Sequence, residues 1–367
     1  MSEEKNMPIQ FKPELLPPPC GFVNIGATCY WNAFLQGLIT CTTFAEILLQ
    51  HQDEEKYKAN PVAQMFVALF KEFETMKYKV VPASQGSTEL LKEREETIAY
   101  NISLVNRVDK YAPDIWHCMN NLLRDRKKEY MRSGQQDSNE ISMMLIDSLE
   151  ELEEIQDLFM HQYLVSIYCH ICNEMCSEKT WEYPFFDVDP RLKSAQLEKF
   201  AGWDKSPPID GDLQSYLLKQ NSYVDQDYRC EKCKVATARF KLTRLSKVPE
   251  ILIVLSKNYN KDQVTNYVPE LQFNMKGRPD KKLQYRAVAQ IEHSGNTQGG
   301  HYWAYALRAR CDFSRREGET VGETADSVEN DNWWRLDDSS FTRTSQQLRP
   351  TVNTYMVFYN FMGVIDA

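Results

Sequence analysis

The amino-acid sequence predicts an α+β protein in which a mainly helical half precedes a mainly β half. Up to about residue 159 the apolar residues recur at helical spacing, whereas after residue 163 short runs of β-branched and aromatic residues dominate. Helices and strands therefore do not alternate along the chain. This order favours a largely antiparallel sheet over the parallel sheet of repeated βαβ units.

Composition narrows the class of protein. The 367 residues are 42% hydrophobic and 26% charged, which is typical of a globular protein. The net charge of -9 argues against nucleic acid as a partner, because phosphate binding relies on clustered Lys and Arg. No apolar run is long enough to cross a membrane, and no signal peptide is evident. We therefore expect an intracellular protein, in the cytoplasm or nucleus, whose ten cysteines are thiols or metal ligands.

A flexible leader and four helices are predicted for the first half. Residues 1–19 are polar and end in three prolines, so the ordered domain is expected to begin at Cys20. Amphipathic periodicity then predicts helices over Cys29–Leu49, Pro61–Phe73, Asp114–Met131 and Asp137–Phe159.

The second half contains six clear β-type runs and two inserted segments. The inserts are 191–212, which is rich in Pro and Gly, and 317–331, which is acidic, and both predict loops. The β-type runs cover 163–169, 235–245, 250–259, 284–293, 299–308 and 354–361.

Cys29 is the first candidate functional residue, in the stretch CGFVNIGATCYWNAFLQ at residues 20–36. Gly26 and Ala27 allow a tight approach, and Thr28 is a fair N-cap, so Cys29 is expected at a helix start. The unpaired amides of a first helical turn favour a thiolate. Asn24 carries an amide that can donate to an oxyanion. The alternative is an ordinary buried helix cysteine.

Two CxxC pairs form a candidate metal site. They are Cys169 with Cys172 and Cys230 with Cys233, each flanked by β-type residues. Four thiolates can hold a tetrahedral zinc ion, and such a closed site stabilises the fold rather than performing chemistry. The alternatives are two unrelated pairs or a single redox CxxC.

A nucleophilic cysteine needs an imidazole base, and the base needs an acceptor that orients it. His301 is the best placed of six histidines, because Gly299 and Gly300 precede it at a strand start. His293 is the competitor. Downstream, the adjacent carboxylates Asp337 and Asp338 offer an acceptor for the imidazole.

These motifs together resemble the ubiquitin-specific protease family, papain-like cysteine peptidases that cleave after the carboxyl-terminal glycine of ubiquitin. The stretch 20–36 resembles the family's cysteine box, and QQDSNEISMMLIDSLEE at 135–151 resembles its second box. The CxxC pairs resemble the zinc-bearing fingers. QIEHSGNTQGGHYWAYALR and WWRLDDSSF resemble the histidine box, so the match covers nearly all of residues 20–362.

The resemblance implies a catalytic domain over 20–362 with three parts. These are a helical thumb over about 20–160, zinc-ribbon fingers over about 162–186 and 222–246, and an antiparallel β palm in the remainder. The implied roles are Cys29 as nucleophile, Asn24 as oxyanion donor, His301 as base, and Asp337 as its orienter, assisted by Asp338. Asp137 and Glu140 would engage the arginine-containing tail of ubiquitin, and Gly299 and Gly300 would either line the tail channel or form a strand-entry turn.

The implied activity is that of a cysteine-dependent deubiquitinase, which hydrolyses the isopeptide or peptide bond after ubiquitin through a thioester. Its partners would be ubiquitin and ubiquitinated proteins, with structural zinc and no catalytic cofactor. Two alternatives stay open: a protease for another ubiquitin-like modifier, and an inactive ubiquitin-binding scaffold.

Overall fold

The computed structural model divides into two compact units, which we describe separately. Unit 1 spans Met1–Gln10, Asp157–Ala287 and Pro350–Ala367, and unit 2 spans Phe11–Gln156 and Val288–Arg349. The structure describes residues 9–79, 87–128, 136–169, 171–172, 174–188, 223–256, 267–275, 278–296, 299–309, 332–344, 348 and 350–367. Both predicted inserted loops, and residues 1–8 of the predicted leader, lie outside these ranges.

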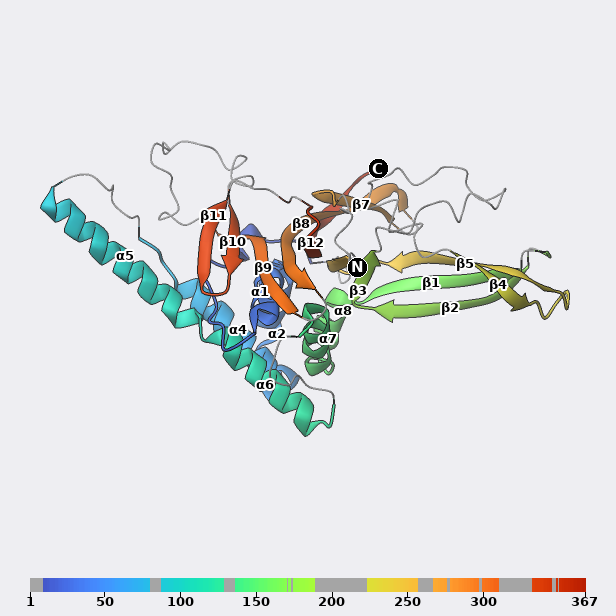
Figure 1. Cartoon of the computed structure of the whole chain (residues 1–367), viewed down its shortest axis with the longest axis horizontal. Coiled ribbons are helices and arrows are strands. Elements are labelled where there is room, and N and C mark those ends of the chain that lie inside the picture. Colours follow the sequence, from blue (N-terminus) through green and yellow to red (C-terminus); the bar gives the residue numbers. More distant parts are fainter. Residues whose placement is uncertain are drawn as a thin grey trace, which may run out of the picture. The chain divides into compact units, whose positions relative to one another are not determined.

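Unit 2 carries the helices (Figure 1). All ten residues of α1 are buried, and α1 packs against two strands and two other helices. The described helices are η2 (Pro13–Leu15), α1 (Cys29–Leu38), α2 (Thr42–His51), α3 (Glu55–Ala59), α4 (Pro61–Thr75), α5 (Thr88–Val108), α6 (Tyr111–Asp125), α7 (Ser138–Ser148) and α8 (Glu153–Phe159), the last of which crosses into unit 1.

Three helix predictions differ from the structure. The segment predicted as one helix from Cys29 to Leu49 is two, because after α1 the backbone N–H groups of Thr40 and Cys41 bond to carbonyls three residues back instead of four. The segment Asp137–Phe159 likewise divides into α7 and α8. The long helix α5 was not predicted, because much of it is charged and its apolar stripe is narrow.

No single helix in the described part of the chain is long and apolar enough to span a membrane. Helices α1 and α2 meet that test of length and composition only as a pair, and the pair is bent by 78°.

The predicted flexible leader is shorter than expected. Phe11 and the three prolines at 17–19 are buried. The backbone N–H of Lys12 donates to Thr42 Oγ1 at 2.7 Å, and the N–H of Ala309 donates to the carbonyl of Pro17 at 2.9 Å. Proline has no N–H that burial would leave unpaired, which lowers the cost of burying this segment within unit 2.

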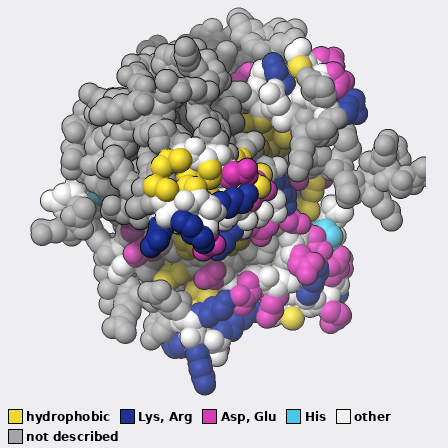
Figure 2. Space-filling model, turned by 90° about the vertical axis from the view of Figure 1, so that its right-hand side faces the viewer, with side chains coloured by type: hydrophobic (Ala, Val, Ile, Leu, Met, Phe, Trp, Pro, Cys, Tyr) yellow, Lys and Arg dark blue, Asp and Glu magenta, His cyan; other side chains and the backbone are white. Residues whose placement is uncertain are grey.

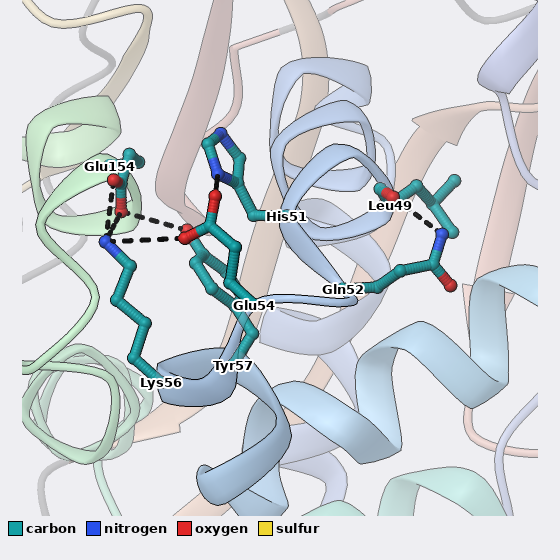
Figure 3. Close-up of polar contacts among 7 residues, drawn as sticks. All are labelled: Leu49, His51, Gln52, Glu54, Lys56, Tyr57 and Glu154. Atoms are coloured by element: carbon teal, nitrogen blue, oxygen red, sulfur yellow. Dashed lines mark hydrogen bonds and ion pairs between the residues drawn. The ribbon is translucent and has the colours of Figure 1, made fainter.

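A polar cluster joins helices α2, α3 and α8 (Figure 3). Lys56 Nζ donates to both carboxylate oxygens of Glu154 at 2.7 Å, and the Tyr57 hydroxyl donates to the same group at 3.2 Å. Burial raises the pKa of Glu154, but these two donors outweigh burial and hold the pKa below its ordinary value. His51 Nδ1 lies 2.6 Å from Glu54, which is 3.8 Å from Lys56. The positive charge of the Lys56 ammonium therefore balances the negative charges of Glu54 and Glu154.

The strands of unit 2 form an antiparallel meander in the order β11-β10-β9-β8. They are the part of β8 (Arg278–Asn296) from Val288 onward, β9 (Gly299–Leu307), β10 (Trp333–Asp337) and β11 (Ser340–Thr344). Helix α1 packs against β9 and also contacts β10.

Unit 1 contains a four-stranded antiparallel sheet, which we call the finger sheet, in the order β2-β1-β5-β4. Its strands are β1 (His161–Cys169), β2 (Met175–Tyr183), β4 (Tyr223–Arg229) and β5 (Ala236–Lys247). The other strands of the unit are β3 (Phe185–Val188), β6 (Ile251–Ser256), β7 (Glu270–Met275), the first part of β8 and β12 (Thr354–Asp366). Strand β6 is buried along its whole length.

The α+β prediction is confirmed, and each of the six predicted β-type runs overlaps a strand. One pairing differs from the expected antiparallel arrangement, since β3 runs parallel to β6.

Several large apolar side chains of the finger sheet and its turns are exposed. Ile171, Met175, Trp181 and Val235 are each between 45% and 59% accessible. Figure 2 shows hydrophobic side chains gathered beside basic and acidic ones on the face that it views. These four side chains therefore add little to the burial of apolar surface that stabilises a sheet.

His161 begins β1 and is completely buried. Neither ring nitrogen has a hydrogen-bond partner in the described part of the chain. The rings of Tyr163, Phe186 and Tyr183 surround it, with centroids 4.6, 5.8 and 6.4 Å away. Burial lowers the pKa of His161 from 6.5 to about 3, because an imidazolium in this apolar site would lose its hydration.

We expect His161 to make unit 1 sensitive to acid. Since its pKa is lower in the folded state, the unfolded chain takes up a proton first, and stability falls as the pH drops from 6.5 towards 3. Between pH 7 and pH 5 the unaltered protein should lose about 2 kcal/mol more free energy of unfolding than His161→Phe. Urea unfolding at the two pH values measures this difference. Equal losses in the two proteins would contradict the prediction, and His117→Phe, at an exposed histidine, is the control.

Candidate active site

Cys29 is the first residue of α1, as the sequence predicts. The preceding loop is held by the side chain of Asn24, whose Oδ1 accepts from the N–H groups of Gly26 at 3.0 Å and Thr28 at 3.1 Å. Gly26 and Ala27 have φ values of 104° and 60°, so the chain turns sharply here. Thr28 does not cap the helix through its hydroxyl, which instead donates to Asn24 Oδ1 at 3.2 Å.

The expected ionisation of Cys29 is wrong for the protein without substrate. Burial raises the pKa of the Cys29 thiol, and the Asp338 carboxylate raises it further. Backbone N–H groups of Tyr302, Tyr30 and Cys29 itself act in the opposite direction but do not prevail. Only 3% of the residue is exposed, so loss of hydration outweighs the amides of the first helical turn.

His301 and Asp337 lie together on neighbouring strands. His301 is on β9 and Asp337 ends β10, and His301 Nε2 is 2.6 Å from Asp337 Oδ1. The competing His293 on β8 instead stacks on Tyr302, with ring centroids 4.3 Å apart. The structure therefore gives His301 the carboxylate partner that an orienting role requires.

Asp338 connects the cysteine loop to the β10–β11 turn. Its Oδ2 accepts from Asn24 Nδ2 at 2.9 Å, and its Oδ1 accepts from Asn32 Nδ2 at 2.8 Å. Because Asn24 Oδ1 is held by backbone N–H groups, the orientation of its amide is fixed by these bonds. One N–H of Asn24 therefore points at Asp338, and the other is left for a further acceptor.

A close backbone approach secures this arrangement. A Cβ atom at Gly21 would lie 2.4 Å from the carbonyl oxygen of Ser339, so only glycine fits there. The N–H of Phe22 donates to the carbonyl of Asp338 at 2.9 Å. Asp338 has a φ of 50°, a conformation that aspartate tolerates better than most residues.

Cys29 and His301 are not joined by a hydrogen bond in the described structure. They belong to the same unit, and α1, which Cys29 begins, packs against β9, which carries His301. Because Nε2 of His301 faces Asp337, Nδ1 is the nitrogen available to the thiol. The arrangement thus contains a thiol whose pKa burial raises and a separately oriented imidazole.

The two acidic residues of the second box lie near the same region. Asp137 is the N-cap of α7 and accepts from the N–H of Asn139 at 2.7 Å, and Glu140 is in the first turn of that helix. Burial raises the pKa of the Tyr302 hydroxyl, and Asp137, Cys29 and Glu140 add to the rise. All three groups therefore lie within electrostatic reach of Tyr302, which follows His301.

Gly300 has a packing reason to be glycine. A Cβ atom there would lie 2.3 Å from His293 Nε2 and 2.4 Å from the carbonyl oxygen of Ser294. Gly299 and Gly300 pair with Asn296 and Gly295 where β8 and β9 meet. Both glycines therefore form the entry to strand β9. Their place in a substrate channel stays a prediction.

The four cysteines of the CxxC pairs come together. Cys169 and Cys233 have their sulfurs 3.8 Å apart, as do Cys172 and Cys230, and all four sulfurs lie within 4.8 Å of one another. A tetrahedron with Zn–S bonds of about 2.3 Å has edges of about 3.8 Å, so the donor set and spacing fit this ion.

The cluster lies at the two turns of the finger sheet. One pair ends β1 and enters the turn to β2, and the other pair connects β4 to β5. Backbone hydrogen bonds, chiefly from Cys233, lower the pKa of Cys230 to about 6. Cys176 is outside the cluster and bonds instead to the carbonyl of Glu174 at 3.5 Å, and His170 lies outside the described residues.

Three residues at the site were missed from the sequence. Asn32 follows Cys29 by three residues and therefore shares its helix face, which is the signal that identifies it. Tyr302 supplies a backbone contact to Cys29 that no pattern indicates. Arg335 alternates with Asp337 along β10, so strand periodicity places both on one face. The acidic insert 317–331, predicted as a loop beside the histidine box, is outside the described residues.

Comparison with known proteins gives a consistent match. The sequence profile of a family described as ubiquitin carboxyl-terminal hydrolase matches residues 20–359. Ubiquitin carboxyl-terminal hydrolase 12 of Salmo salar is 22% identical over 356 residues, covering 92% of this chain and 88% of that protein. Ubiquitin carboxyl-terminal hydrolase 37 of Bos taurus is 26% identical over 257 residues, covering 65% of this chain and 23% of that protein.

Solved structures show the same fold. The SAGA DUB module of Ubp8, Sgf11, Sus1 and Sgf73 bound to monoubiquitin matches 99% of this chain and 73% of that chain, with a TM-score of 0.59 at 15% identity. The same module bound to ubiquitin aldehyde matches 100% and 73%, with a TM-score of 0.56 at 15% identity.

Proposed function

The chain belongs to the ubiquitin carboxyl-terminal hydrolase family, and on that premise we propose that it is a cysteine-dependent deubiquitinase. It would hydrolyse the isopeptide or peptide bond that follows the carboxyl-terminal glycine of ubiquitin. The observation that carries this proposal is the 2.6 Å contact between His301 Nε2 and Asp337 Oδ1, beside the helix that begins at Cys29.

Proton transfer in this reaction would begin from a neutral thiol. Burial raises the pKa of Cys29, so the proton has to pass to His301 Nδ1 as the sulfur attacks the glycine carbonyl. Asp337 holds the other nitrogen and stabilises the imidazolium that forms. His301 then protonates the departing lysine amine, and a water molecule activated by the same imidazole hydrolyses the thioester.

The oxyanion would be stabilised by Asn24 and by the start of α1. The Asn24 amide is fixed in orientation and has an N–H beyond the one bound to Asp338. The backbone N–H of Cys29 lies at the amino end of a helix, where unpaired donors and the helix dipole favour negative charge. Asp338 would thus act by orienting Asn24 rather than by contacting His301.

Recognition of the ubiquitin tail is proposed for the acidic start of α7. Asp137 and Glu140 bring negative charge close to Tyr302, which follows the proposed base. An arginine in the tail would be attracted to this region. Asp137 also caps α7, and Glu140 stands in the first turn of the same helix, so both carboxylates lie at one helix end.

We also propose that Cys169, Cys172, Cys230 and Cys233 hold a structural zinc ion. The support is the sulfur spacing of 3.8 Å and the close grouping of all four atoms. None of the nine cysteines in the described residues forms a disulfide, which fits the reducing intracellular location that we propose.

A ubiquitin derivative with an electrophilic carboxyl terminus tests the proposed activity. We expect the unaltered protein to form a covalent adduct, and Cys29→Ala to form none. Cys118→Ala, at a partly exposed thiol on α6, is the matched control and should label normally. If the unaltered protein binds ubiquitin without labelling, it is a scaffold. Labelling only by a probe built on another ubiquitin-like modifier would reassign the substrate.

A further inference from the structure

Asp337 is held at both carboxylate oxygens. Its Oδ1 contacts His301 Nε2 at 2.6 Å, and its Oδ2 accepts from Arg335 Nη2, also at 2.6 Å. Arg335 and Asp337 are two residues apart on β10 and therefore project from the same face. No other side chain of the described residues donates to the Asp337 carboxylate. The nearby Asn24 and Asn32 donate to Asp338 instead.

Trp303 completes a ring of four side chains. The centre of the Arg335 guanidinium lies 5.5 Å from the centroid of the Trp303 ring. The Trp303 ring lies 6.2 Å from that of His301, at an interplanar angle of 25°. Strand β10 pairs with β9 so that Arg335 is opposite Tyr305 and Leu336 is opposite Ala304. His301, Asp337, Arg335 and Trp303 therefore share one face of the β9–β10 pair.

The hydrogen bond from Arg335 restricts rotation of the Asp337 carboxylate about its terminal torsion. The terminal torsion of an aspartate is broad, so a carboxylate held at one oxygen turns easily. A bond at the other oxygen fixes its plane, and the tryptophan restricts the guanidinium that makes this bond. The plane of the carboxylate in turn fixes the direction of the imidazole.

We propose that Arg335, restricted by Trp303, is a positioning residue for the His301–Asp337 pair. It acts through Asp337 to keep the imidazole in the orientation that presents Nδ1 to Cys29. The inference rests on the proposed function, because it assigns Arg335 a part in that reaction.

The exposure of the Arg335–Asp337 ion pair distinguishes a positioning role in the reaction from a contribution to folding stability. The side chains of Arg335 and Asp337 are 45% and 24% exposed. Ion pairs this accessible contribute little to folding stability, because solvent screens them. Loss of Arg335 should therefore change the rate of the reaction and leave stability nearly unchanged.

Kinetics of Arg335→Met and Arg335→Lys test the proposal. With a fluorogenic ubiquitin amide, we expect kcat of Arg335→Met to fall by about 10- to 100-fold, with KM and thermal stability nearly unchanged. Arg335→Lys should recover part of the loss. Arg278→Met is the matched control, because Arg278 bonds to Asp280 with the same spacing on strand β8, and its kcat should equal that of the unaltered protein.

A double-mutant cycle shows whether Arg335 acts through Asp337. Asp337→Asn should lower kcat strongly, and adding Arg335→Met to it should cause little further loss. Losses that multiply would overturn the proposal, as would a rise in KM at unchanged kcat.

A spectroscopic test examines the positioning role of Arg335 independently of whether the protein cleaves ubiquitin. In protein with isotope-labelled histidine, the Nε2–H proton of His301 should give a sharp, far-downfield signal without any ubiquitin present. The signal should broaden in Arg335→Met and persist in Arg335→Lys and Arg278→Met. If the unaltered protein cleaves no ubiquitin substrate, the function fails while this signal still decides the positioning role. An unchanged signal in Arg335→Met would refute that role.

Discussion

Cys230→Ser is expected to unfold the finger sheet, and removal of the metal by a strong chelator is expected to do the same. Structural zinc sites contribute binding free energies of about 10–16 kcal/mol in isolated zinc fingers, and that energy is folding energy. Strand β2 of the finger sheet gains little stability from burial, since seven of its nine residues are exposed and the other two are half-buried. A loss of even half this amount, about 5–8 kcal/mol, is comparable to the whole stability of many domains, which is about 5–15 kcal/mol.

Thermal unfolding and elemental analysis measure this effect. The unaltered protein should contain one zinc ion per chain, and Cys230→Ser should contain none. Cys176→Ser is the matched control, because this cysteine lies beside the cluster without belonging to it. The prediction is refuted by a metal-free purified protein, or by equal stability of the two serine variants.

Arg308→Met is expected to lower the free energy of unfolding by about 3 kcal/mol, the net effect of leaving several buried acceptors without a donor. Arg308 is completely buried just after β9. Its guanidinium donates to Thr40 Oγ1 at 2.6 Å, to the carbonyl of Leu307 at 2.7 Å, and to both side-chain and backbone oxygens of Gln36.

The charge of Arg308 is stabilised by oxygens rather than by a carboxylate in the described structure. Burial lowers the pKa of Arg308 to about 10, so the group still carries its charge at neutral pH. The carbonyl of Gln36 belongs to the last turn of α1, where the helix dipole favours a cation.

Urea unfolding of three variants tests this account. Arg308→Lys should be intermediate in stability, because an ammonium reaches only some of the four oxygens. Arg124→Met, which removes an exposed arginine bonded to Asn121, should change stability by less than about 0.5 kcal/mol. A methionine variant as stable as the unaltered protein would show that burial of the charge costs as much as its hydrogen bonds return.

The residues of the site could be predicted where a single sequence motif indicates both their chemistry and their position in the fold. The CxxC spacing indicates its own ligand set, and β-type runs on either side place each pair at a turn. The glycines before His301 and the paired aspartates after an aromatic strand likewise narrow the base and its partner to a few residues.

Other features depend on the surroundings that the fold creates. The first-turn position of Cys29 suggested a thiolate, but burial and Asp338 reverse that expectation. The sequence indicates Asn24 as a donor to the oxyanion, but it does not show that Asn24 also bonds to Asp338, 314 positions away. The burial of the proline segment similarly depends on distant partners, since Ala309 and Tyr78 donate to the carbonyls of Pro17 and Pro19.

Helix α1 and strand β9 carry the two proposed reacting groups, and they contact each other at both ends. Near one end Tyr302 approaches Cys29, and at the other end Arg308 binds the last turn of the helix. Sliding one element along the other would break the contacts at both ends together. The remaining gap between sulfur and imidazole is therefore expected to close by rotation of side chains about their own bonds. A crystal of the ubiquitin adduct should accordingly superpose α1 and β9 on their substrate-free positions, with new χ angles at Cys29 or His301.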